Sequence, residues 1–339
     1  MTVSPLKPIS LADIEGFAIG HSTDQQAGTG CTVIVAPEGA TGGVDVRGGA
    51  PASRETDLLR PENTVDIVNA VVLSGGSAFG LEAASGVARE LEGRCIGLPV
   101  GPTKVPIVCS SCIFDLAFGD AFTRPGIAEG VAAVGDALDD GGHADAQGNV
   151  GAGTGATVGK LQGPDCAMKS GLGAQAYALG NIKMGALTAV NACGNVYDPR
   201  TGEAIAGMRA NAESDQIVSM EDAAFAAAGA MEMPLDRTNT TISCLVTNAR
   251  LTKAQCTKLA QMAADAYAHA IRPTHTTNDG DTIYVLASGK EDASEIPLDL
   301  LGMLAVRTLE DAIASGARSA ETSHSLPGAA SLKADTAEA

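Results

Sequence analysis

The segment RTNTTISCLVTN, residues 237–248, marks the sharpest change of character along the chain. It begins inside residues 205–238, which are rich in Ala, Met, Glu and Asp and are typical of an exposed connector. It continues into a β-branched, apolar run that predicts a strand over residues 241–248, buried on both faces. Strands of this kind occur in layered α/β domains, in which helices cover the sheets, so the segment favours that fold class.

Four further apolar runs predict strands, and the segments between and after them predict helices. The strands are expected at residues 31–36, 66–73, 185–192 and 281–288. Helices are expected after Ser77 and near residues 221–230. A third helix is expected from Thr252, which forms a capping box with Gln255. A fourth is expected from Pro297 to Ser315, with Gly316 as the C-terminal stop. Residues 1–339 are therefore expected to form one mixed α/β (α+β) domain, with a loosely held tail over residues 318–339.

The composition predicts a compact globular protein and argues against several classes of partner. The chain has 339 residues, of which 45% are hydrophobic and 18% charged. Its net charge of −18 opposes binding to nucleic acid or anionic lipid; it favours neutral or cationic small substrates, or serves only to keep the surface soluble. Because no apolar run is long enough to span a membrane and the first residues lack the apolar core of a secretory signal, we expect a cytoplasmic protein.

The cysteine and histidine patterns favour neither a disulfide framework nor a metal site. Eight cysteines in a chain of this size are expected to be free thiols in a reducing compartment. Cys109 and Cys112 form a CxxC, but the sequence has no second pair, and the flanking apolar residues favour buried packing over redox or zinc chemistry. The five histidines contain no HExxH motif and no obvious ligand pair, so we expect no metal. The chemistry considered below, a hydroxyl activated by an amine, needs no organic cofactor either.

The glycine-rich stretch GNVGAGTGATVGK, residues 148–160, is a candidate binding loop. It resembles a phosphate loop, but no apolar strand leads into it, and Leu161 stands where such a loop needs Ser or Thr. We interpret it as a tight loop that presents Lys160, either to a site or to solvent.

A second candidate loop, SGGSAFG at residues 74–80, joins a buried strand to a helix. The backbone N–H groups of Gly75, Gly76 and Ser77 could bind a carboxylate or carbonyl oxygen of a substrate at the start of that helix. An ordinary tight turn without a ligand explains the pattern equally well.

The junction of Asn239 and Thr240 offers a way for the chain to cut itself. A Thr240 hydroxyl held against the Asn239 carbonyl could attack it, and hydrolysis of the resulting ester would leave Thr240 as a new amino terminus. A free α-amine titrates near pH 7.7–8.0, so it can act as general base for its own hydroxyl. The alternative is an ordinary loop-to-strand boundary.

Asp279 and Asp281 lie on either side of Gly280, just before the predicted strand at residues 281–288. Alternate residues entering a strand face the same side, so the two carboxylates could act together on an amine or a hydroxyl. The alternative is a turn at Asp-Gly with two solvated acids.

Several ordered motifs together resemble the DmpA family of self-processing aminopeptidases and amidases, which includes L-aminopeptidase/D-esterase, β-peptidyl aminopeptidases and nylon-oligomer hydrolase. The likeness extends over nearly the whole chain. It rests on SGGSAFGLEAASGV, KVPIV followed by IFDL, GAGTGATVGK, AVNACGNVYDPRTGE, NTTISCLVTNARL and HTTNDGDTIY.

The resemblance implies an αββα sandwich of the N-terminal-nucleophile type, similar also to ornithine acetyltransferases. It implies a cut between Asn239 and Thr240 into chains 1–239 and 240–339, which stay intertwined as a pair, with four pairs in a homo-oligomer. Thr240 is then the nucleophile, Asn191 gives an amide to the oxyanion hole, and Lys160 lies near the nucleophile. Asp279 and Asp281 orient the new amino terminus.

The sequence departs from the family at two positions. Many aminopeptidase members have Ser after Gly at the cut, whereas NTT with DGD is closer to the nylon-oligomer-hydrolase branch, and some members have Tyr where this chain has Phe114. We therefore expect a hydrolase of short peptides, β-peptides, amino acid amides or oligoamides, acting through an acyl-enzyme. Two alternatives are an acyltransferase of the ornithine acetyltransferase type and a non-catalytic small-molecule-binding protein on the same scaffold.

Overall fold

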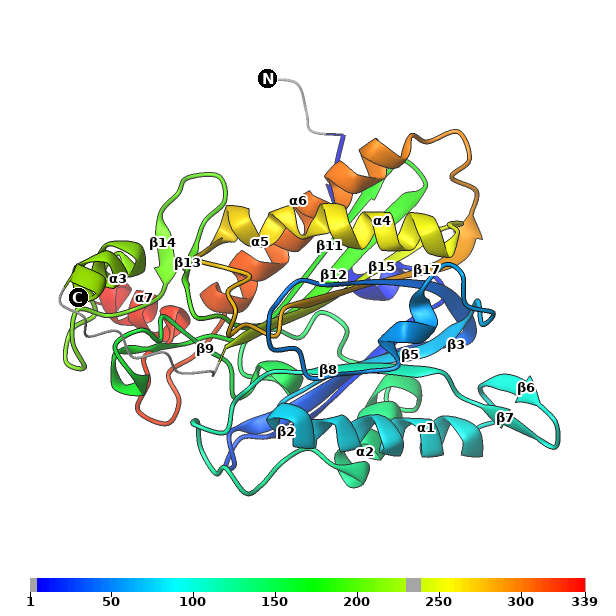
Figure 1. Cartoon of the computed structure of the whole chain (residues 1–339), viewed down its shortest axis with the longest axis horizontal. Coiled ribbons are helices and arrows are strands. Elements are labelled where there is room, and N and C mark those ends of the chain that lie inside the picture. The colour runs from blue at the N-terminus through cyan, green and yellow to red at the C-terminus, as the bar shows by residue number, and fades with distance from the viewer. Residues whose placement is uncertain (1–4, 230–238, 339) are drawn as a thin grey trace.

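Two β-sheets joined by one long strand form the centre of the molecule, as a computed structural model of residues 5–229 and 239–338 shows (Figure 1). The joining strand is β3 (Thr29–Val46), whose first part belongs to one sheet and whose last part belongs to the other. The first sheet has the order β1 (Lys7–Pro8), β11 (Leu172–Leu179), β12 (Ile182–Asn191), β15 (Thr240–Ala249), β17 (Thr282–Glu291), β3. The second continues through β5 (Val68–Ser74), β8 (Val108–Cys112) and β4 (Ser53–Arg54), with β2 (Ala18–Asp24) on the other side of β3.

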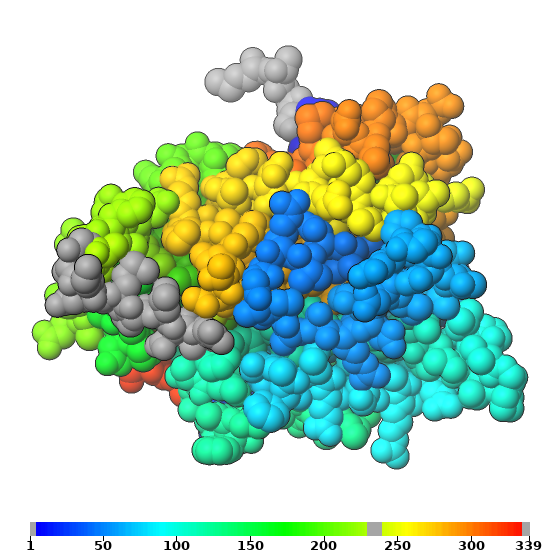
Figure 2. Space-filling view, in the orientation of Figure 1, coloured from blue at the N-terminus to red at the C-terminus, as the bar shows by residue number. Residues whose placement is uncertain are grey.

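Helices cover the outer face of each sheet, which gives four layers. The first sheet is covered by α4 (Lys253–Ala263), α5 (Asp265–Ala270) and α6 (Leu298–Arg318), the second by α1 (Ala83–Gly93) and α2 (Ile127–Leu138). In Figures 1 and 2 the yellow and orange helices lie along the top of the molecule and the cyan helices along the bottom. The expected αββα sandwich is confirmed.

Alternation along the strands explains how the layers are held together. In β15, Ile242 and Cys244 face the second sheet, whereas Leu245 faces the helices α4 and α6. Tyr284 and Leu286 of β17 repeat the pattern and lie between the two sheets. Successive side chains of a strand point to opposite faces, so a strand inside a sandwich must be apolar on both.

Short elements surround the sandwich. The hairpin of β6 (Leu98–Val100) and β7 (Thr103–Val105) projects at one end (Figure 1). Near the other end lie β9 (Thr157–Val158) with β10 (Met168–Lys169), β13 (Asn195–Tyr197) with β14 (Ala204–Ala206) and β16 (Ile271–Arg272), and the helices α3 (Met220–Gly229) and α7 (Ala329–Glu338).

The predicted strands all coincide with observed ones, and the capping box of Thr252 and Gln255 is confirmed at the start of α4. The predicted stop at Gly316 is wrong, because α6 continues to Arg318. Gly316 instead lets the helix lie close to β11: a Cβ on it would be 2.8 Å from the backbone nitrogen of Gly173. Its small size therefore serves packing and not helix termination.

Two other expectations on exposed segments differ from the structure. Met208 and Arg209, in the expected exposed connector, are buried, although α3 is largely exposed; residues 230–238 lie outside the described residues. The first part of the expected loose tail is attached to the body, since the Lys169 N–H donates to the Pro327 carbonyl at 3.0 Å and Ala329 is buried.

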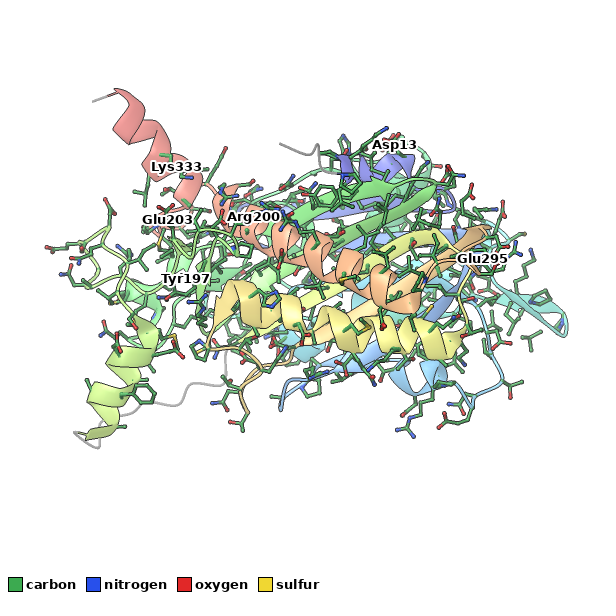
Figure 3. All side chains as sticks on the ribbon, turned by 90° about the horizontal axis from the view of Figure 1, so that it is seen from above. Asp13, Tyr197, Arg200, Glu203, Glu295 and Lys333 are labelled. Atoms are coloured by element: carbon green, nitrogen blue, oxygen red, sulfur yellow. The ribbon has the colours of Figure 1, made fainter. Side chains whose placement is uncertain are left out.

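Residues before and after the predicted cut are joined on the outer side of the first sheet. The guanidinium of Arg200 lies beside α6 (Figure 3) and donates to both oxygens of Asp311, at 2.7 and 2.5 Å. Tyr177 donates its hydroxyl to Asp311 as well, at 2.7 Å. Within residues 5–229 and 239–338, the helices include none with the length and apolar character needed to cross a membrane.

Candidate active site

Thr240, the first residue of β15, lies at the polar edge of the first sheet. It is buried and pairs with Asn191, the last residue of β12. Its hydroxyl donates to the carbonyl oxygen of Asn239, the peptide group directly before it. The N–H of Gly280 donates to the same carbonyl oxygen at 3.1 Å. A hydroxyl and an N–H donor thus converge on one buried peptide carbonyl.

Strand direction explains why the DGD sequence lies beside Thr240. The strands β15 and β17 are parallel, so both begin at the same edge, and Asn239 forms a bridge with Asp279 just ahead of the two strands. Gly280 is needed there because a Cβ at this position would lie 2.8 Å from the Thr240 hydroxyl oxygen. The spacing of the two acids around a glycine therefore follows from the close approach of the threonine.

Asp281 is held by many donors on the strand side of this loop. Its Oδ1 accepts the N–H of Thr241 at 2.7 Å, which fixes the residue next to the proposed nucleophile. Its Oδ2 accepts the N–H of His275 at 3.1 Å and hydrogen-bonds with His275 Nδ1 at 2.9 Å. Burial pulls the pKa of His275 down, but the hydrogen bond and charge of Asp281 outweigh it, so that pKa is raised.

Asp279 has a less favourable environment for its charge. Its Oδ2 accepts the N–H of Thr276 at 2.6 Å. Burial, together with the nearby charge of Asp281, raises the pKa of Asp279 to about 6. Asp279 can therefore hold a proton at a higher pH than an ordinary aspartate.

Lys160 enters the site from the end of the glycine-rich loop, after β9. Its Nζ donates to Oδ1 of Asn191 at 2.7 Å and to the backbone oxygen of Asn191 at 3.0 Å. Burial lowers the pKa of Lys160 to about 7, although the charges of Asp279 and Asp115 oppose that effect. A lysine with such a pKa can accept a proton near neutral pH.

Asn191 lies at the end of a strand, as the sequence predicts, but its amide group is bound within the protein. Its Nδ2 donates to the carbonyl of Phe114 at 2.9 Å, and its Oδ1 accepts from Lys160 and from the N–H of Thr157 at 3.0 Å. The donor that the structure aims at the Asn239 carbonyl is the Gly280 N–H. Sequence reasoning missed this donor because a backbone N–H leaves no residue-type signal.

The expected substrate-binding N–H groups of Gly75, Gly76 and Ser77 are used within the protein. They donate to Gly30 O at 2.9 Å, Asp115 Oδ1 at 2.6 Å and Ile113 O at 2.9 Å. This segment is the tight turn that the alternative interpretation describes, and a ligand there would have to displace these bonds.

Asp115 is a site residue that sequence reasoning missed, although it lies in the quoted IFDL motif. It is buried, and its Oδ2 accepts the Thr29 hydroxyl at 2.7 Å. Burial raises the pKa of Asp115, while its hydrogen bonds act in the opposite direction. With Lys160, which binds Asn191, it lines a cavity.

The CxxC pair is not part of this site. Cys109 and Cys112 are buried thiols in β8, and burial raises the pKa of each. Across the residues that the structure describes, no group of three or more His, Cys, Asp or Glu side chains is arranged to hold a metal ion.

Solved structures with the same fold define the class of the protein. The L-aminopeptidase/D-Ala-esterase/amidase of Ochrobactrum anthropi, described as a variant among the Ntn hydrolase fold, superposes with a TM-score of 0.66 at 18% identity, covering 92% of this chain and 86% of that chain. A β-aminopeptidase of Burkholderia sp. gives a TM-score of 0.64 at 18% identity, covering 97% of this chain and 93% of the other. The chain therefore has an Ntn-hydrolase fold.

Sequence comparison then gives the family: the chain belongs to peptidase family S58, whose model matches residues 10–330. An uncharacterized aminopeptidase of Mycobacterium leprae is 40% identical over 298 residues, which are 84% of this chain and 80% of the relative. A 6-aminohexanoate-oligomer endohydrolase of Agromyces sp. is 31% identical over 304 residues, 89% of this chain and 82% of the relative. The resemblance to the DmpA family is confirmed, and the chain is a hydrolase of peptide or amide bonds.

Proposed function

We propose that the chain cuts itself between Asn239 and Thr240 and then hydrolyses amide bonds of short peptides, β-peptides, amino acid amides or oligoamides, with Thr240 as nucleophile. The observation that carries the proposal is the Thr240 hydroxyl directed at the Asn239 carbonyl, which also receives the Gly280 N–H. The substrate range follows relatives that are named aminopeptidase and 6-aminohexanoate-oligomer endohydrolase.

Self-cleavage uses Lys160, which binds the pairing partner of Thr240, and the Gly280 N–H. Neutral Lys160 takes the Thr240 hydroxyl proton, and the oxygen attacks the Asn239 carbonyl carbon. Negative charge then develops on the carbonyl oxygen, where the Gly280 N–H already donates at 3.1 Å. The C–N bond breaks as protonated Lys160 gives its proton to the nitrogen, which becomes the Thr240 amine. Water then hydrolyses the ester and leaves a carboxylate on Asn239.

Substrate hydrolysis repeats this chemistry with the new amine as base. The Thr240 α-amine, which titrates near pH 7.7–8.0 in the absence of perturbation, accepts the hydroxyl proton and later protonates the departing amine. Asp281, which accepts the neighbouring Thr241 N–H, and Asp279 position this amino terminus. Asn191 and Lys160 remain beside the acyl-enzyme, which water hydrolyses.

The products 1–239 and 240–339 stay together in this proposal because their strands and helices interlock. After the cut, β15 belongs to the smaller fragment but still pairs along β12 of the larger one. The helix α6 of the smaller fragment packs on β11 and β12, and its Asp311 binds Arg200. The expected homo-oligomer and cytoplasmic location stay predictions.

Intact-mass measurement of the parent, Thr240→Ala and Thr240→Ser proteins tests the proposal. The parent and the serine variant, which keeps a hydroxyl, should give two species divided after Asn239. The alanine variant should give one full-length species without amide hydrolysis. An alanine variant cut at the same bond, or an uncut parent that hydrolyses amides, would contradict the proposal.

A further inference from the structure

A cavity lined in part by Lys160 also has a wall from the C-terminal part of the chain. Two of its lining residues, Thr157 and Lys160, bind Asn191, the pairing partner of Thr240. Leu326 lines the same cavity. The remaining lining residues are Phe114, Asp115, Ala117, Phe118, Gly163, Pro164 and Ala167.

Leu326 is presented by a tight turn. The N–H of Leu326 donates to the Ser323 carbonyl at 3.0 Å, and the N–H of Ser323 donates back to Leu326 at 3.1 Å. The two residues between them, His324 and Ser325, have φ of 49° and 66°, in the left-handed region that residues other than glycine rarely adopt. Such conformations persist where surrounding contacts fix them.

The segment that carries this turn, residues 321–328, is called the C-terminal strap below. At its beginning, the Asn149 side chain exchanges two hydrogen bonds with the backbone of Glu321, at 3.0 and 3.2 Å. At its end, the Pro327 carbonyl accepts the Lys169 N–H. The strap is thus attached on both sides of Leu326 and lies near β9 and β10, in red in Figure 1.

The strap also fixes a second wall of the cavity. The His324 ring packs against the Phe118 ring with 4.7 Å between centroids, and His324 Nε2 hydrogen-bonds with the Gln26 carbonyl at 3.2 Å. Phe118 is buried and lines the cavity. Because His324 and Leu326 belong to the same turn, the positions of both apolar walls depend on the strap.

The lining of the cavity indicates what it would bind. Its polar groups, Thr157, Lys160 and Asp115, each have hydrogen-bond partners within the protein. The other side chains are aromatic or aliphatic, except for one glycine. A largely apolar lining that includes two residues bound to Asn191 favours an uncharged hydrocarbon chain close to the scissile carbonyl.

We propose that this cavity binds the apolar acyl chain of the substrate and that Leu326, supplied by the C-terminal strap, limits the length of chain that is accepted. This inference rests on the proposed function, since it places the carbonyl of the bound acyl group at Thr240. It gives the strap a role in substrate selection, with an oligoamide whose acyl group is an unbranched hydrocarbon chain as the chemical class of substrate.

Calorimetric binding of hexanamide and acetamide in the Thr240→Ala background tests the proposal without turnover. The added substitution Leu326→Ala should weaken hexanamide binding about tenfold and leave acetamide unchanged, because only the longer chain reaches the strap. Leu326→Met, which nearly keeps the volume, should stay within about twofold. Leu300→Ala, the same substitution at a partly exposed position of α6, is the matched control and should change neither ligand.

Equal hexanamide binding by the Leu326→Ala and Leu300→Ala proteins would overturn the proposal, as would a Thr240→Ala protein that binds hexanamide no more tightly than acetamide. Thermal unfolding of each variant identifies loss of folding as a cause. Failure of the proposed function is read separately, from the hydrolysis of hexanoyl p-nitroanilide by proteins with and without the Thr240 hydroxyl. Expected hexanamide binding together with Thr240-independent turnover would remove that function and, with it, the acyl role of the cavity.

Discussion

The regions around Lys160 and Lys169 share an electrostatic property but differ in their surroundings. Burial lowers the pKa of each lysine to about 7. The Nζ of Lys169 is enclosed and donates to the backbone carbonyls of Gly153, Ala156 and Ser170. The Nζ of Lys160 donates to Asn191, and the charge of Asp279 acts on its pKa. Lys160 also lines the cavity that Leu326 lines. A lowered pKa alone therefore does not identify a catalytic lysine. The groups around its Nζ distinguish the two lysines.

Lys160→Met gives the largest effect expected from this comparison. Self-cleavage should slow by about 10²–10⁴-fold, the usual contribution of a general base, because no neutral amine remains beside Asn191. The free energy of unfolding should change little, since Asn191 Oδ1 keeps the Thr157 N–H as a donor and removal of the charge offsets part of the loss. Fragment appearance followed by mass spectrometry, together with urea unfolding, measures both. A variant that is cut at the parent's rate would remove Lys160 from the mechanism.

Lys169→Met should have the opposite effect to Lys160→Met: it should lower stability and leave self-cleavage in place. The Ser170 carbonyl loses the Lys169 donor, whereas the carbonyls of Gly153 and Ala156 still accept the N–H groups of Ala156 and Ser170. An unpaired buried polar group costs about 1–3 kcal/mol and each further lost hydrogen bond about 0.5–1.5 kcal/mol, partly offset by removal of a buried charge. We expect unfolding free energy to fall by about 3 kcal/mol, while folded molecules still cut themselves. Loss of self-cleavage in a variant as stable as the parent would show that the two regions do not differ as described.

Asp279→Asn removes the carboxylate charge that acts on Lys160 and distinguishes its surroundings from those of Lys169. Its effect on the free energy of unfolding should be smaller than that of Lys169→Met. The native pKa of about 6 lies above the unfolded value near 3.9, so the native state binds the extra proton between these values and parent stability falls as pH rises through this window. The asparagine variant should therefore be more stable by about 2 kcal/mol above pH 7, with no gain below pH 4.

The matched control for that experiment is Asp281→Asn. This change weakens bonds donated by Thr241 and His275, so it should destabilise the protein above pH 7. Urea unfolding of both variants at pH 4 and pH 7.5 gives the comparison. Equal losses in the two variants at pH 7.5 would contradict the different environments assigned to the two acids.

Much of the fold could be predicted because it follows from local patterns. The β-branched runs of β15 and β17 are apolar on both faces, and the start of α4 is marked by two residues close in sequence, Thr252 and Gln255. The role of Gly316 could not be predicted from its sequence neighbours, because it depends on the close packing of α6 against Gly173, which is far away in the sequence. Local sequence does not show which segments pack together.

The candidate site shows the same division. The polar residues Thr240, Asp279 and Asp281 were predicted from hydroxyl and carboxylate chemistry together with family motifs, and strand pairing brings them to one edge. Leu326 was missed because the residues around it are mostly small or polar and lie near the C-terminal end of the sequence, a composition typical of a loose tail. The role proposed for it depends on contacts that its neighbours make with residues far away in the sequence, Pro327 with Lys169 and His324 with Phe118.

N-terminal sequencing of the smaller fragment from active enzyme tests the central claim most directly. The account predicts a fragment of residues 240–339 that begins Thr-Thr-Ile-Ser, with a free amine on Thr240 beside the hydroxyl that performs the attack. Active enzyme without such a fragment, or with a new amino terminus at any other residue, would contradict it.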